Sequence, residues 1–279
     1  MKIQRVLVVV TAIIGAFARA LVTALGLASL SSPPIEAAPT DSDRGETRYL
    51  AFQVFTGSPD PHVPIGGEPV LGDPPSAATL DAFATDVAAR IGTTGNSRTR
   101  LALIFGPISF DQTDAQVFDL IRSGFAIALA HDLAVGFHLD DSMFWGRRGD
   151  LLADPRNIEQ LDWGGARSSG RRLDWGPVAG HAPPQMCFNS PAIESEVRRR
   201  GTEVIGRALK AGISRLHDAG RDDLFAGVIV GWETQIGRDF ATGATLGYGA
   251  AGNRGLAPGA SADTLDRARV DAVEHFISL

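Results

Sequence analysis

Residues 99–141 read TRLALIFGPISFDQTDAQVFDLIRSGFAIALAHDLAVGFHLDD, and this stretch decides the class of fold. It begins and ends with apolar runs, and between them Val117, Leu120 and Ile121 recur at helical spacing. Strands buried on both faces are apolar along their length, and strands that alternate with helices form parallel sheets. The stretch therefore predicts a β-α-β unit, and with it an α/β protein.

The same alternation extends in both directions from this unit. Strands are expected at residues 49–57, 99–106, 133–141 and 224–234. Helices are expected at residues 76–92, 113–129, 191–219 and 261–279. Ser190 followed by Pro191 is typical of a helix start. In the last helix one apolar face is expected, formed by Leu265, Ala268, Ala272 and Phe276.

Two architectures fit four such units, an eight-stranded (β/α) barrel and an open doubly wound sheet. Dinucleotide-binding folds carry the motif G-x-G-x-x-G after their first strand, and this motif is absent after the first expected strand. We therefore expect no cofactor. Long loops follow the first, third and fourth strands, and barrels carry their sites on the loops after strands. We therefore interpret residues 49–279 as the N-terminal half of a TIM-type (β/α) barrel, truncated after the fourth βα unit.

The N-terminus has the pattern of a secretory signal. Two basic residues precede an apolar run at residues 6–17, and small residues follow it. Arg19 interrupts the run before it reaches the roughly 20 residues that a membrane span needs. We expect residues 1–38 to be a cleaved signal peptide and residues 39–48 to be a polar linker. The mature protein is then secreted or periplasmic and has no stable membrane insertion.

Charge and cysteine content restrict the partners of the chain. Its 26 Lys and Arg residues and 32 Asp and Glu residues give a net charge of −6. Loss of residues 1–38 removes three basic residues and one acidic residue, which leaves −8. An acidic protein is poorly suited to polyanions, so we expect no nucleic-acid partner. Cys187 is the only cysteine, so no intrachain disulfide can form. The oligomeric state is left open.

Ionisable and aromatic residues gather at the carboxyl ends of the third and fourth expected strands, where parallel α/β folds carry their catalytic groups. They are His138, Asp140, Asp141 and Trp145 at the third strand, and Trp232 and Glu233 at the fourth. Aromatic rings stack on the apolar face of a sugar, while carboxylates hydrogen-bond its hydroxyl groups. We expect all four tryptophans on one rim and a carbohydrate as the substrate.

Glu233 is the predicted catalytic acid/base. It follows the apolar run AGVIV, whose side chains should flank the carboxyl group. Such surroundings raise the pKa of a glutamate toward general-acid use. A strand-end ion pair is the alternative role. The residues predicted to bind the substrate are His138, Asp140, Asp141, Trp145 and Trp232.

The segment CFNSPAIESEV at residues 187–197, together with Glu233, resembles the clan-A glycoside hydrolases. In the family-42-type β-galactosidases of that clan, a similar Cys-x-Asn-x-Pro segment opens the helix before strand four. The resemblance implies an acid/base glutamate at the position of Glu233, where Trp232 replaces the usual preceding asparagine. It also implies a nucleophile glutamate after the seventh strand of the barrel. That position lies beyond the four strands expected here. Such a retaining hydrolase uses two carboxylates about 5 Å apart.

Two other function classes fit the same residues. A metal-dependent hydrolase would use His138, Asp140 and Asp141. Their spacing matches no recognised ligand signature, so we expect no metal. A non-catalytic carbohydrate-binding protein would use the aromatic residues without a pair of catalytic carboxylates.

Overall fold

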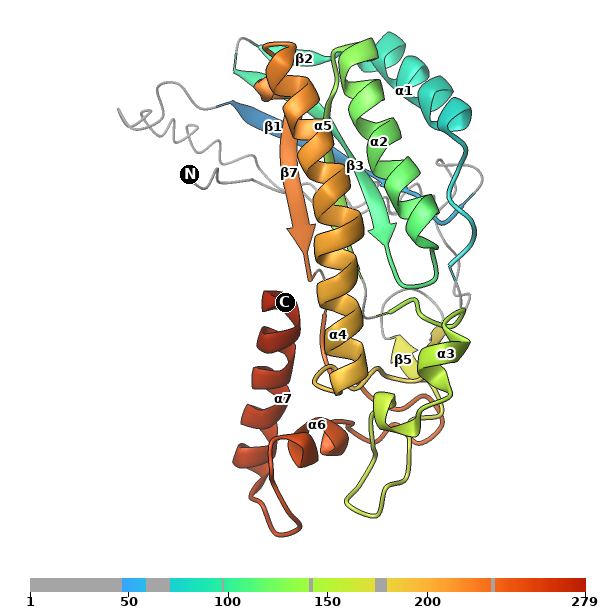
Figure 1. The fold of residues 1–279 in the computed structure, drawn as a ribbon, viewed down its shortest axis with the longest axis vertical. Coiled ribbons are helices and arrows are strands. Elements are labelled where there is room, and N and C mark those ends of the chain that lie inside the picture. The colour runs from blue at the N-terminus through green and yellow to red at the C-terminus, as the bar shows by residue number, and fades with distance from the viewer. Residues whose placement is uncertain (1–46, 59–70, 97, 141–142, 174–179, 232–233) are drawn as a thin grey trace, which may run out of the picture.

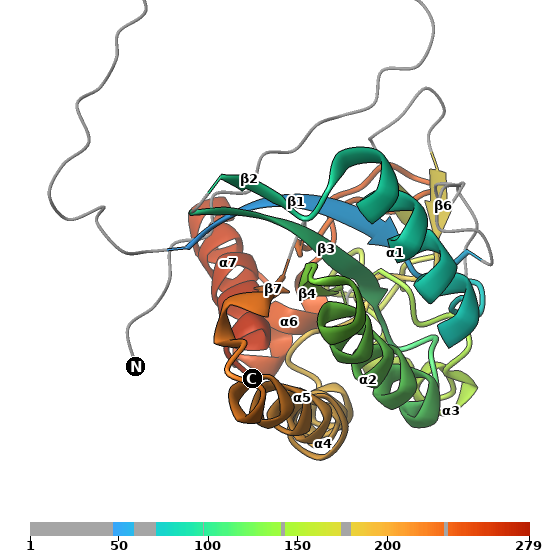
Figure 2. The same cartoon turned by 90° about the horizontal axis from the view of Figure 1, so that it is seen from above.

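The computed structural model describes residues 47–58, 71–96, 98–140, 143–173, 180–231 and 234–279. Its upper part in Figure 1 is an α/β unit, in which helices cover one face of a parallel sheet (Figures 1 and 2). The strands point toward a second, loop-rich region that ends in helix α7 (Ala262–Ser278). The predicted signal peptide at 1–38 lies outside the described residues, as does nearly all of the linker at 39–48.

The sheet is parallel apart from one short strand. Its order is β1-β3-β4-β7, so each parallel strand lies beside the parallel strand that follows it along the chain. The parallel strands are β1 (Arg48–Phe55), β3 (Thr99–Ile108), β4 (Ala134–Leu139) and β7 (Phe225–Val230). The short strand β2 (Thr94–Asn96) pairs antiparallel with β3. The predicted α/β class and parallel sheet are thus confirmed.

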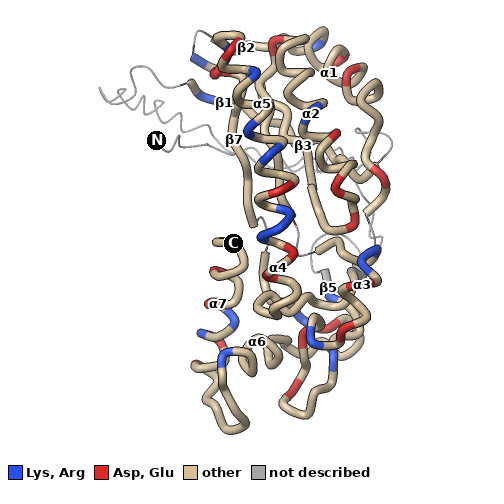
Figure 3. The backbone as a smooth tube through the Cα atoms, in the orientation of Figure 1, with Lys and Arg blue, Asp and Glu red and all other residues tan. Residues whose placement is uncertain are grey.

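Helices α1 (Ala77–Ile91), α2 (Asp114–His131) and α5 (Arg207–Asp218) lie on one face of this sheet, with α2 packed against both of the others (Figure 2). Between them and the strands lies the main core, which joins Leu103 and Phe137 of the sheet to Phe125 of α2. The other face of the sheet carries smaller buried side chains, namely Ala102, Ala134 and Ala226, with Ile104 among them. In Figure 3 charges lie mostly on helices and loops, and the strands are tan for most of their length.

Local sequence explains where the helices begin. The hydroxyl groups of Ser76 and Thr113 accept the backbone N–H groups of Thr79 and Gln116, which caps α1 and α2. Helix α4 (Pro191–Arg199) begins at Pro191, as predicted. The serine before it does not cap the helix, because its hydroxyl hydrogen-bonds to Asn157 instead.

Helix α4 continues through a π-helical segment, η3 (Arg200–Gly206), into α5, which gives one long helix. Figure 1 shows it running from the lower region up along the sheet. Its lower part buries Ile193 in the core of the lower region. Its upper part buries Ala208 and Leu216 in the main core.

The lower region contains short elements that the sequence patterns do not predict. The expected loop at 142–190 contains α3 (Gly149–Leu152), the 3-10 turn η2 (Pro155–Asn157), β5 (Arg171–Leu173) and β6 (Gly180–Ala182). The long loop expected after the fourth strand contains α6 (Tyr248–Asn253). Outside the lower region, a further 3-10 turn, η4 (Asp222–Leu224), precedes β7 and places Leu224 in the main core. None of these elements is long enough for a periodic apolar pattern to form.

Candidate functional site

The candidate site lies where β3 and β4 end. The backbone N–H of Asp140 donates to the carbonyl of Ile108, 3.0 Å away, which holds the two strand ends together. Asp140 and His138 are both buried, at 5% and 7% exposure. Since carboxyl ends of parallel strands share one edge of a sheet, the structure brings these two predicted residues together at the edge where parallel α/β folds carry their sites.

His138 makes a hydrogen bond across the sheet. Its Nδ1 lies 3.0 Å from Nε2 of Gln53, which belongs to β1 on the far side of β3. Burial lowers the pKa of His138 from 6.5 to about 4. The imidazole is therefore neutral at physiological pH, which suits a hydrogen-bonding role better than an ionic one.

Asp111, a residue that the sequence patterns did not single out, ties three loops together at this edge. It follows β3, and its carboxylate accepts the backbone N–H groups of Leu71 at 2.6 Å and Arg147 at 2.7 Å. Leu71 comes from the loop after β1, and Arg147 from the loop after β4. Burial raises the pKa of the Asp111 carboxyl, against the opposing effect of these two hydrogen bonds. The side chain fixes the relative positions of the loops around the site.

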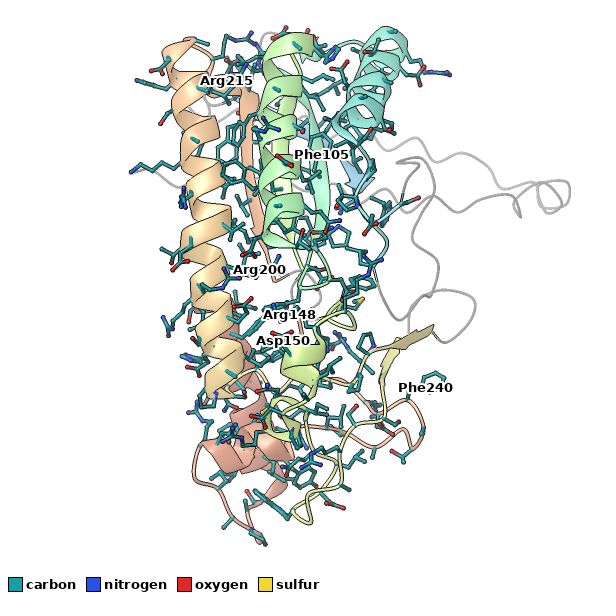
Figure 4. The ribbon with its side chains drawn as sticks, turned by 45° about the vertical axis from the view of Figure 1, so that its right-hand side comes forward. Phe105, Arg148, Asp150, Arg200, Arg215 and Phe240 are labelled. Atoms are coloured by element: carbon teal, nitrogen blue, oxygen red, sulfur yellow. The ribbon has the colours of Figure 1, made fainter. Side chains whose placement is uncertain are left out.

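Two arginines hold the loop after β3 from below. The guanidinium groups of Arg200 and Arg148 lie 5.2 Å and 5.6 Å from the ring centre of Phe110. Arg200 also donates to the carbonyls of Ser109 and Gln112, at 3.0 and 3.2 Å. Figure 4 shows both arginines where the sheet meets the lower region. The long helix thereby supports the floor of the candidate site.

The two described tryptophans do not share a rim. Trp145 is fully buried with Phe110 and Met186, and its Nε1 donates to the carbonyl of Pro184 at 2.8 Å. Trp163 packs edge-on to Tyr248, with ring centres 5.3 Å apart, in a separate cluster beneath α7. Trp145 therefore presents no exposed ring face for a sugar, because the loop in which it lies folds back into the lower core.

Three of the predicted site residues lie outside the described residues. They are Asp141, Trp232 and Glu233. Gly231 and Thr234, which flank the last two in the sequence, line an apolar cavity of about 200 Å³ together with Leu139, Val230 and Ile277. This cavity lies next to the long helix and α7.

A buried glutamate that sequence reasoning missed belongs to the lower region. Glu159 accepts the backbone N–H groups of Gly249 and Ala250 at 2.9 and 2.8 Å, and so fixes the start of α6. Burial raises the pKa of its carboxyl. Burial also raises the pKa of the neighbouring Cys187 thiol, which stays protonated. The segment 187–197 thus contributes to the packing of α6 as well as opening α4, since Asn189 donates to the carbonyl of Ala250 at 2.9 Å.

Within the described residues, no group of three or more His, Cys, Asp and Glu side chains is arranged to hold a metal ion. In the same part of the chain, no helix is both long and apolar enough to cross a membrane. No family model matches the sequence, and neither a curated protein nor a solved structure is similar enough to it to support a comparison.

Proposed function

We propose that the chain is a secreted protein of the glycoside hydrolase type, which acts on a carbohydrate by carboxylate acid/base chemistry. The observation that carries the proposal is the set of buried polar side chains where β3 and β4 end, namely Asp111, His138 and Asp140. Hydroxyl groups of a sugar are recognised by such neutral and anionic hydrogen-bonding groups at the end of a parallel sheet.

The sheet is, in this proposal, part of a TIM-type barrel. Its strands follow in sequence order, and its sheet-covering helices α1, α2 and α5 lie on one face (Figure 2). Leu50 and Phe52 on β1 are each 40% exposed, although they lie on the helix-covered side. In a closed barrel β1 has a second strand neighbour and a further helix over it, which would cover these side chains.

Glu233 is the proposed general acid, and it follows β7 by three residues in the sequence. Strand β7 pairs with β4, so its carboxyl end lies on the same edge of the sheet as His138 and Asp140. These two residues would hold the sugar, with Asp141 and Trp232 beside them. We leave Trp145 out of the proposed site because its ring is fully buried.

The test uses a protein that includes the nucleophile glutamate which the proposal requires after strand seven, and it compares two kinds of glycoside. Glu233→Gln removes the transferable proton, so glycosides with poor leaving groups should be cleaved about 10²–10⁴-fold more slowly. Aryl glycosides with acidic leaving groups need little protonation and should be affected less. Asp140→Asn should slow both kinds alike if Asp140 binds the sugar.

Glu203→Gln is the matched control, because Glu203 is an exposed glutamate on the long helix. It should leave both rates unchanged. An unchanged ratio of the two rates in Glu233→Gln, with activity near that of the wild type, would show that Glu233 is not the acid.

A further inference from the structure

The apolar cavity of about 200 Å³ lies where the two cores of the molecule meet. Ile205 of the long helix lines it and belongs to the main core, whereas Phe276 of α7 lines it and belongs to the core of the lower region. Leu139 and Val230 line it at the carboxyl ends of β4 and β7. Its walls are therefore the end of the sheet, the π-helical part of the long helix and the last turn of α7.

Close contacts hold these walls in place. Figure 1 shows the end of α7 just below the tip of β7. Gly231, which follows β7, has a φ of 72°, and a Cβ atom there would lie 2.7 Å from Cγ1 of Ile277. A glycine at this position allows α7 to lie so close to the end of the strand. The ring of Phe276 stacks on Phe188, with ring centres 4.5 Å apart. The cavity is thus formed by packed residues, as ligand pockets usually are.

The lining of the cavity favours a hydrocarbon over water or a sugar. Among the described residues that line it, Thr234 has the only polar side chain, and none of their side chains carries a charge. A buried water molecule needs about two to four polar partners, and this lining offers few. A sugar ring would leave hydroxyl groups without hydrogen bonds, which is costly. An apolar molecule loses nothing of this kind, and its transfer from water into the cavity is favourable.

The cavity is accessible, and its volume limits the size of the ligand. Val230 is 50% exposed and Ile277 is 38% exposed, so solvent reaches the cavity beside these two side chains. An engineered apolar cavity of about 150 Å³ in another protein binds benzene. A cavity of about 200 Å³ therefore fits one ring of about seven or eight carbon atoms in total.

We propose that this cavity is a binding site for a single small, uncharged hydrocarbon ring, such as a methyl-substituted benzene. The inference does not rest on the proposed function, because neither His138 nor Asp140, the described residues proposed to hold the sugar, lines the cavity. The bound ring contacts residues of both cores at once. Its binding therefore stabilises the junction between the sheet and the lower region.

The test is a titration of the full chain with toluene, followed by NMR of isotopically labelled methyl groups of Ile, Leu and Val. The methyl signals of Val197, Ile205 and Ile277, which line the cavity, should shift in a saturable way. The dissociation constant should be about 1 mM or lower. Val87 of α1 packs against the main core and does not line the cavity, so its signals are the internal control. D-galactose should leave the signals of the three lining residues unchanged.

Two substitutions of Val197 change the size of the cavity in opposite directions. Val197→Phe fills part of it and should weaken the binding of toluene by about tenfold or more. Val197→Ala enlarges it and should shift the preference from toluene toward the larger mesitylene. Ile213→Phe is the matched control, because Ile213 lies on the same long helix, is 38% exposed and does not line the cavity. It should bind toluene as the wild type does.

The wild-type titration decides the inference even if a variant does not fold. Lining methyl signals that do not respond to toluene, or that shift without saturation, would overturn it. Equal affinities of the wild type and a folded Val197→Phe would overturn it as well, because the ring would then bind elsewhere.

Discussion

Gly212 of α5 offers the sharpest test of how the helices pack on the sheet. A Cβ atom at this position would lie 1.9 Å from Cδ2 and 2.2 Å from Cε2 of Phe125. The Phe125 ring cannot move aside easily, because it is 1% exposed and packs against Phe137 and Phe225 with ring centres 5.4 and 5.6 Å away. Overpacking of this kind costs about 1–3 kcal/mol, and so short a contact favours the upper end.

Alanine also favours the helix over glycine, by about 1 kcal/mol. Gly212→Ala should therefore lower the free energy of unfolding by a net amount of about 2 kcal/mol, which corresponds to a loss of about 4–8 °C in Tm. Gly201→Ala is the matched control on the same long helix, because nothing lies within 4 Å of the added Cβ atom there. It should gain up to about 1 kcal/mol. Thermal melts followed by circular dichroism measure both. A Gly212→Ala protein as stable as the wild type would mean that α5 does not lie against Phe125.

Two further predictions concern stability. The pKa of His138 is lowered to about 4, so the stability that depends on its neutral form is complete above pH 6.5 and is lost as the pH falls toward 4. From about pH 7 to about pH 4.5 the wild type should lose about 2–3 kcal/mol more than His138→Gln in denaturant titrations, and equal losses would contradict the assignment. Asp239 accepts four hydrogen bonds from Ser169 and Thr242, so Asp239→Ala should cost about 1–3 kcal/mol in thermal melts. Asp162→Ala, which removes one exposed hydrogen bond, should cost no more than about 0.5 kcal/mol, and similar losses for the two variants would refute this reasoning.

The elements that the sequence predicts well are those with long periodic patterns. All four residues of the expected apolar face of α7 are buried, and the continuous apolar runs at 99–106 and 133–141 became β3 and β4. The position of these three elements follows from which of their side chains are buried. Buried side chains recur at regular spacing in the sequence, so the pattern predicts the elements. Strand β7 is shorter than the expected strand at 224–234, because the pattern gives the apolar core of a strand but not its end.

The lower region was not predictable in the same way, because distant polar contacts determine it. Helix α6 starts where it does because Glu159, about 90 residues earlier in the chain, accepts its first N–H groups. The same holds in the candidate site, where His138 was singled out and its partner Gln53 was not. That pair depends on the order of the strands and on Gly106 between them. Trp145 is the opposite case, because the sequence predicts it in the site and the structure places it in the core of the lower region.

The long helix has a consequence for how the protein unfolds. Through Ile193 it belongs to one core, and through Val204, Ile205 and Leu216 it belongs to the other. The wide π-helical turns of η3 lie at the change from one to the other. A helix loses its hydrogen bonds cooperatively. If one of the two cores opens, the long helix frays, and the other core then loses the helix residues that it buries. Amide hydrogens of α4 and α5 should therefore exchange with solvent as a single unit, which makes the two regions one cooperative block.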